Sequence, residues 1–80
     1  MPGDAERVEV IQMLLARLAR ISADSPWAYK ASGLRGSFMR CLDAYEAGSP
    51  PAPARVEALI DYGFMILEKV AQITAPKPEG

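Results

Sequence analysis

The sequence contains no histidine and only one cysteine, Cys41. Histidine is the most common general base and the most common metal ligand in proteins, so its absence removes most hydrolytic triads and most zinc sites. A single cysteine cannot form an internal disulfide, and no cysteine pair has the spacing of a structural zinc site. We therefore expect a chain that folds by packing alone, has no enzymatic activity and uses no cofactor or metal.

The chain also lacks a large excess of charge of either sign, because nine Lys and Arg residues oppose ten Asp and Glu residues. This balance argues against bulk electrostatic binding to nucleic acid or to a membrane surface. No apolar run approaches the length of a membrane span, and the first residues are acidic and polar where a secretory signal is basic and then apolar. We expect a cytoplasmic protein that does not associate with membranes.

Half of the 80 residues are apolar, which excludes general disorder and predicts one helical domain covering residues 1–80. Apolar residues recur at helical spacing in the segments 4–22, 26–47 and 53–73. Residues 74–80 contain too little apolar surface to order themselves and are predicted to form a disordered tail.

Local signals place the ends of these helices. Asp4 is expected to cap the first helix, and Ser25 followed by Pro26 predicts the start of the second. Gly48 and the prolines after it end the second helix. The third segment has the broadest apolar surface and is expected to be central.

Short connections favour antiparallel neighbours, so the sequence predicts an all-α, up-down-up three-helix bundle. The apolar faces of 4–22 and 53–73 are wider than the narrow stripe of 26–47 can cover. This excess predicts a homodimer, and an intertwined or bundled dimer is the main alternative to the single bundle.

Gly33 and Gly36 interrupt the second helix at a cost of roughly 1 kcal/mol each relative to Ala. Either the helix kinks there, or these glycines and the neighbouring serines form a smooth patch that another helix or a turn approaches closely. The segment 33–36 contains glycines, as phosphate-binding loops do, but it lacks the preceding strand and the lysine of such loops.

One thiol and two carboxylates could take part in chemistry, but each also has a purely structural interpretation. Cys41 lies in the apolar stripe, which favours a buried thiol over a nucleophile. Glu57 and Asp61 lie one helical turn apart, where acids on a polar face are ordinarily solvated instead of paired for catalysis or metal binding.

The preferred function is a non-enzymatic protein–protein interaction or oligomerisation module, which binds a protein partner, itself or both. No stretch matches a motif that identifies a family. Flexible methionines and amphipathic tyrosines at the margins of the apolar stripes are the partner-binding candidates, and the alternative is that they are scattered surface residues. These candidates are Met13, Tyr29, Met39, Tyr62 and Met65.

The alternative function is binding of nucleic acid or another anionic ligand through the basic region around the second helix. Trp27 and Tyr29 supply rings that can stack on bases, but the balanced net charge and the place of Trp27 on the apolar stripe count against this hypothesis. The anion-binding candidates are Arg17, Arg20, Lys30, Arg35 and Arg40.

Overall fold

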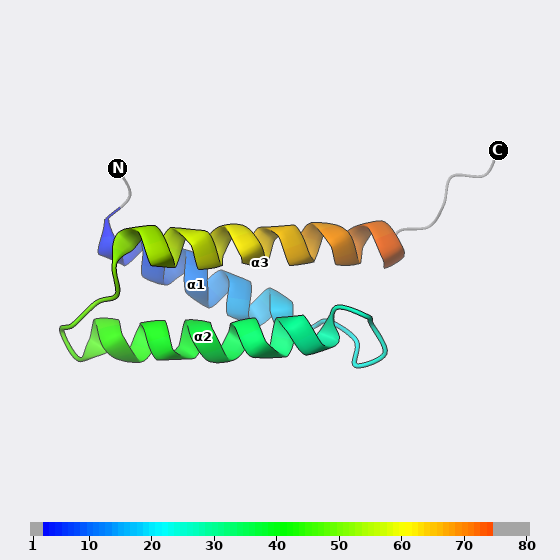
Figure 1. Ribbon diagram of the computed structural model, residues 1–80, viewed down its shortest axis with the longest axis horizontal. Helices are drawn as coiled ribbons and strands as arrows, with labels where there is room; N and C mark the ends of the chain where they lie inside the picture. Colours follow the sequence, from blue (N-terminus) through cyan, green and yellow to red (C-terminus); the bar gives the residue numbers. More distant parts are fainter. Residues whose placement is uncertain (1–2, 75–80) are drawn as a thin grey trace.

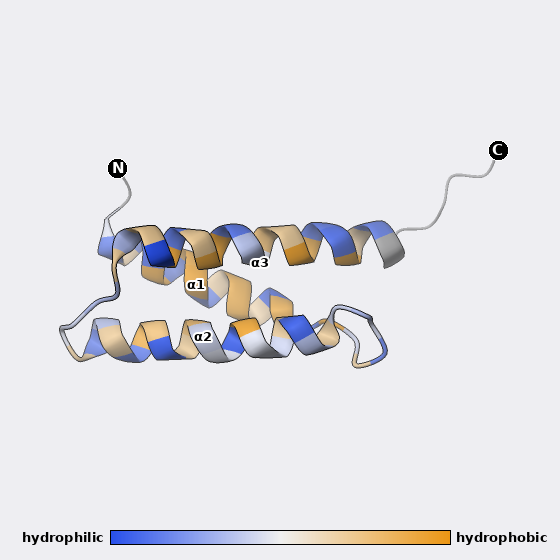
Figure 2. Ribbon diagram, in the orientation of Figure 1, coloured by the Kyte–Doolittle hydropathy of each residue, from blue (hydrophilic) through white to orange (hydrophobic). Residues whose placement is uncertain are grey.

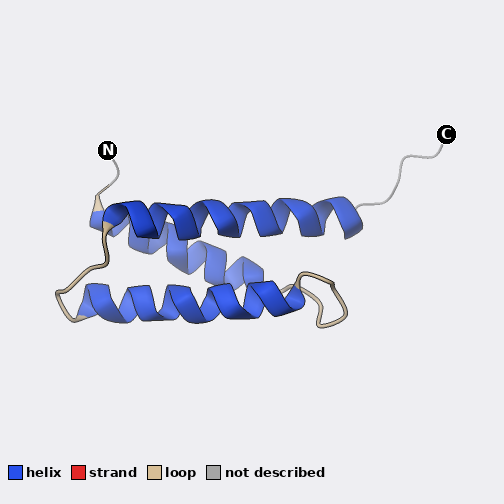
Figure 3. Ribbon diagram, viewed as in Figure 1, coloured by secondary structure: helices blue, strands red, loops and turns tan. Residues whose placement is uncertain are grey.

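The computed structural model describes residues 3–74, and within that range it contains three α-helices and no strand (Figure 3). They are α1 (Asp4–Leu18), α2 (Ala28–Glu46) and α3 (Pro53–Thr74). Figure 1 shows α1 and α3 running in one direction and α2 in the other, and each helix packs against the other two. The predicted all-α, up-down-up three-helix bundle is therefore confirmed.

The first helix is shorter than predicted, because it ends at Leu18 and not at residue 22. Beyond Leu18 the backbone tightens: the amide of Arg20 donates to the carbonyl of Arg17, and that of Ile21 to the carbonyl of Leu18. Such bonds between residues three apart are typical of a closing helical turn. They bring the half-buried Ile21 against the core.

The prediction that Asp4 caps α1 was wrong. Gly3 occupies the N-cap position with an extended backbone, and no side chain caps the helix. Asp4 is instead the first helical residue, where its negative charge suits the positive end of the helix dipole.

The second helix begins at Ala28, two residues later than the predicted start at Pro26. The amide of Trp27 donates to Ser25 Oγ at 3.2 Å, and the amide of Ala28 donates to the Ser25 carbonyl at 3.0 Å. Ser25 therefore holds a turn that precedes the helix.

The C-terminus of α2 closes in a Schellman motif. The helix ends at Glu46, and Gly48 has a φ of 80°, a left-handed conformation that glycine adopts without strain. The amide of Gly48 donates to the carbonyl of Tyr45, and the amide of Ser49 to that of Ala44. These two bonds satisfy carbonyls that the helix itself leaves free.

The helix α2 runs without interruption through Gly33 and Gly36. A Cβ atom at Gly33 would meet nothing within 4 Å, and one at Gly36 would meet only Arg40 Nη1, at 3.8 Å. Within residues 3–74, neither another helix nor a turn therefore approaches these glycines closely, so the predicted close approach is not found in this part of the chain.

The third helix extends through Thr74, so the predicted tail does not begin at that residue. Residues 75–80 of the predicted tail lie outside the described residues.

The core is formed by all three helices, and Figure 2 shows hydrophobic residues recurring along each of them. The expectation that the third helix is central was wrong, because each of the three helices packs against the other two and α3 holds no special place among them. In a bundle of three, each helix has only two neighbours, so part of the broad apolar face of α3 stays at the margin. The buried hydrophobic residues are Ile11, Leu14 and Leu18 of α1, Ala31, Leu34, Phe38 and Cys41 of α2, and Val56 and Ile66 of α3.

A point of close packing between the helices lies at Gly63 of α3, which is buried. A Cβ atom at this position would lie 3.2 Å from Leu14 Cδ1 and 3.5 Å from Leu34 Cδ2. Leu14 is fully buried and Leu34 nearly so, which leaves both side chains little room to move away. The missing side chain at Gly63 therefore allows α1, α2 and α3 to meet at one level.

We predict that Gly63→Ala is less favourable for folding than Gly33→Ala by about 1 kcal/mol or more. Both glycines lie inside helices, so each replacement gains roughly 1 kcal/mol of helix propensity. Only at Gly63 does the new methyl group press on the core. Denaturant unfolding of the two variants measures the difference, and equal stabilisation by both replacements would contradict the close contact.

Candidate functional site

The most unusual side chain in the bundle is Arg7 of α1, which is only 7% exposed. It lies in the same helical row as Ile11, Leu14 and Leu18, all of which are buried hydrophobic residues. Arg7 is the one buried polar or charged side chain among the described residues. A cation has thus been placed at the end of the apolar row of α1.

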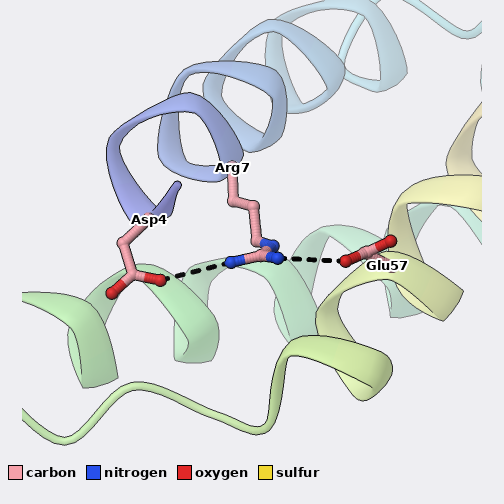
Figure 4. Close-up of polar contacts among 3 residues, drawn as sticks. All are labelled: Asp4, Arg7 and Glu57. Atoms are coloured by element: carbon pink, nitrogen blue, oxygen red, sulfur yellow. Dashed lines mark hydrogen bonds and ion pairs between the residues drawn. The ribbon is translucent and has the colours of Figure 1, made fainter. Parts of the chain in front are cut away.

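Two carboxylates compensate the charge of Arg7 (Figure 4). Its Nη2 atom donates to Glu57 Oε2 of α3 at 3.1 Å, and its Nη1 atom donates to Asp4 Oδ1 of α1 at 3.4 Å. Arg7 Nε is buried and has no hydrogen-bond partner among residues 3–74. The guanidinium group therefore bridges α1 to α3 and is incompletely satisfied.

Sequence reasoning missed this bridge. Glu57 was expected to be simply solvated; about half of its side chain is indeed exposed, but its carboxylate also binds Arg7. The signal for Arg7 was its position, four residues before Ile11 and seven before Leu14, in the row that faces the core.

A groove of about 220 Å³ lies beside Arg7, between α1 and α3. Val10 and Ile60 are half-buried in it, and the ring of Phe64 at its side is 46% exposed. We call it the α1/α3 groove; its lining residues are Glu6, Arg7, Val10, Glu57, Ile60, Asp61 and Phe64.

A second hollow, of about 510 Å³, lies between α1 and α2 and is more polar. Tyr45 belongs to its lining, together with residues that include Val8, Leu42 and Asp43. Burial raises the pKa of the Tyr45 phenol above its ordinary value, and the carboxylate of Asp4 adds to this increase while Arg7 opposes it. The pKa of this residue at the end of α2 therefore depends in part on the charges of Asp4 and Arg7.

The structure does not bring the five partner-binding candidates together. Met13 of α1 is 36% exposed, and Tyr29 and Met39 of α2 are 90% and 57% exposed. Tyr29 and Met39 lie ten residues apart, which separates them by about 15 Å along the helix. Tyr62 and Met65 of α3 are half-buried and pack against the core.

The exposed aromatic residue of α3 is Phe64. Its exposure had a signal in the sequence. Phe64 shares one row of α3 with the acids at spacings of four and three residues, a row formed by Glu57, Asp61, Phe64 and Glu68.

The five anion-binding candidates are all exposed, but they do not form one patch. Lys30, Arg35 and Arg40 follow each other at intervals of five residues, which turns each about 140° around the helix from the last. Lys30 Nζ lies 4.9 Å from the centre of the Trp27 ring, and Arg40 Nη2 donates to Ser37 Oγ. The other two candidates are Arg17 of α1 and Arg20 beyond it.

The described residues offer little for catalysis or metal binding. Cys41 is buried, as the apolar stripe predicted. Residues 3–74 contain no group of three or more His, Cys, Asp or Glu side chains that could hold a metal ion. No helix in this range combines the length and hydropathy that crossing a bilayer requires.

Comparison of the chain with protein-family models, with curated proteins and with solved structures gives no match. The function has to be argued from the side chains themselves.

We predict that removing the partners of Arg7 costs more stability than removing Arg7. The double variant Asp4→Asn with Glu57→Gln leaves a buried cation without an anion, and we expect it to lose about 1–3 kcal/mol. Arg7→Met fills the same space without charge and leaves two carboxylates that water can solvate, so we expect a smaller loss or none. Denaturant unfolding measures the stability of both variants. A larger loss for Arg7→Met would contradict the expectation that an unpaired buried charge is the more costly change.

We predict that Tyr45 makes the fold sensitive to alkali. Because its pKa is raised in the folded chain, the unfolded phenol ionises first, near its ordinary value of about 10. The contribution of the neutral phenol is complete below that value and is lost as the pH rises through the folded pKa. Free energies of unfolding measured across this range should fall more steeply for the native chain than for Tyr45→Phe. Parallel curves would contradict the prediction.

Proposed function

We propose that this chain is a small, non-enzymatic interaction module that binds a protein partner in the α1/α3 groove. The observation that carries the proposal is Phe64, an aromatic ring left 46% exposed beside the apolar side chains of Val10 and Ile60. Aromatic residues next to an apolar hollow are frequent anchors of protein interfaces.

The composition of the chain supports the non-enzymatic part of the proposal. The sequence has no histidine, and its one thiol, Cys41, is buried in the core. Of the acids beside the groove, Glu57 is already engaged by Arg7. Neither an activated nucleophile nor a general base stands out beside the groove.

The proposal also includes self-association, through surfaces other than the α1/α3 groove. Tyr29 and Met39 leave apolar area on the outside of α2, away from the core stripe of that helix. Scattered exposed residues of this kind are common on monomers, so they support a dimer less than the groove supports a partner.

Nucleic-acid or anion binding has weaker support. The three candidates on α2, Lys30, Arg35 and Arg40, project in different directions, whereas binding to a phosphate backbone needs cations that act on one face. Of the two rings proposed for stacking, Trp27 is half-buried against the core and has Lys30 over its ring, which leaves only Tyr29 exposed.

A displayed library of amphipathic helical peptides tests the proposed function. The peptides carry apolar residues at helical spacing and random polar residues elsewhere, and they are selected on the native chain. We expect retained peptides to bind Phe64→Ala roughly thirtyfold more weakly, because truncating an aromatic anchor commonly costs that much.

Tyr29→Ala is the matched control, because Tyr29 is a more exposed aromatic residue on another helix. Its removal should leave the affinity unchanged, and circular dichroism should show that both variants stay folded. If no peptide is retained, or if retention is indifferent to Phe64, the proposed function is wrong.

A further inference from the structure

The rim of the α1/α3 groove is strongly acidic. Glu6 of α1 and Asp61 of α3 border it and form no ion pair among residues 3–74. Glu57 completes the rim and is about half exposed despite its bond to Arg7. The one cation of the groove, Arg7, is buried and already occupied by two carboxylates. Water and ligands therefore meet negative charge around an apolar floor.

The acidic character continues along α3 on both sides of Phe64. Residues 57, 61, 64 and 68 are spaced by four, three and four, so they form one row of the helix, and all four side chains are exposed. Asp61 precedes Phe64 in this row and Glu68 follows it. A partner that covers the ring must therefore come within reach of carboxylates at both ends.

The groove is also bordered by two helices. It lies between α1 and α3, which run in the same direction (Figure 1), and its floor contains residues from both. Amphipathic helices bind such grooves by placing an apolar row into the floor and polar residues along the edges.

We propose that the α1/α3 groove binds a basic amphipathic helix of a partner protein. Apolar residues of that helix contact Val10, Ile60 and Phe64, and its lysine or arginine residues meet Glu6, Asp61 and Glu68. This inference rests on the proposed function and adds the chemistry of the partner. Charge complementarity of this kind selects the partner and speeds its association more than it adds affinity.

A second copy of this chain fits the groove poorly. In a twofold dimer the same surface patch faces itself, so the acidic rim of one copy would lie against the acidic rim of the other. Like charges brought together in this way oppose association. The partner must bring the opposite charge.

The test uses the displayed library in which lysine, glutamate, glutamine and serine are equally frequent at the polar positions. We expect lysine to be enriched in the peptides that depend on Phe64. Glu6→Gln and Asp61→Asn should each weaken a recovered peptide by roughly twofold to fivefold. Glu9→Gln, an exposed acid of α1 outside the groove, should leave binding unchanged. High salt should weaken the complex of the native chain more than the complex of a variant that carries both Glu6→Gln and Asp61→Asn.

The outcomes separate this inference from the function it rests on. Enrichment of neutral or acidic peptides that still require Phe64 overturns the basic partner and keeps the interaction module. The absence of any peptide that requires Phe64 overturns both. A native chain that is dimeric by light scattering and becomes monomeric in Phe64→Ala shows a second copy in the groove, which also overturns the basic partner.

Discussion

The arrangement of the three helices depends on the missing side chain at Gly63. Leu14 of α1 and Leu34 of α2 both reach this point of α3: a Cβ atom there would lie 3.5 Å from Leu34 Cδ2 and only 3.2 Å from Leu14 Cδ1, which is closer than an ordinary contact. Interiors are packed so closely that one added methyl group is felt. Because the two leucines enter the space over Gly63, α3 lies close to both neighbours at the same level of the bundle.

The same contact fixes the register of α3 against α1, which the ion pair of Arg7 alone would not do. Asp61 follows Glu57 by one helical turn, so sliding α3 by one turn would give Arg7 a new carboxylate in place of the old one. That slide would also bring Leu67 to the place of Gly63, opposite Leu14. The steric cost of this encounter selects the observed register, and Glu57 is then the acid that meets Arg7.

The fold was largely predictable from the sequence, because it follows from local patterns. Apolar residues at helical spacing predicted three helices, and the glycine and prolines after the second helix marked its end. The ends of the helices were less predictable. The side chain of Asp4 is of a type that caps helices, but it forms an ion pair with Arg7, three residues further along the chain. This ion pair competes with capping. The end of α1 depends on how Ile21 packs, which is a tertiary effect.

The candidate site was predictable only in part, since it depends on which residues meet across helices. Placing Arg7 in the buried row of α1 needed only the helical period, but pairing it with Glu57 needed the register between α1 and α3. The basic residues around α2 appeared clustered because they are near in sequence, although an interval of five residues disperses them around a helix. Nearness along the chain and nearness on a helical surface are different properties.

The exposure of Phe64 follows from the position of Gly63. Successive residues of a helix are separated by about 100°, so when residue 63 points between Leu14 and Leu34, residue 64 must point well outside that contact. Ile60, three residues before Gly63, points in a direction between those of residues 63 and 64 and is half-buried. Burying Phe64 inside this bundle would require α3 to rotate and to press another side chain onto Leu14. The close packing that holds the three helices together therefore also places an aromatic ring at the edge of the α1/α3 groove.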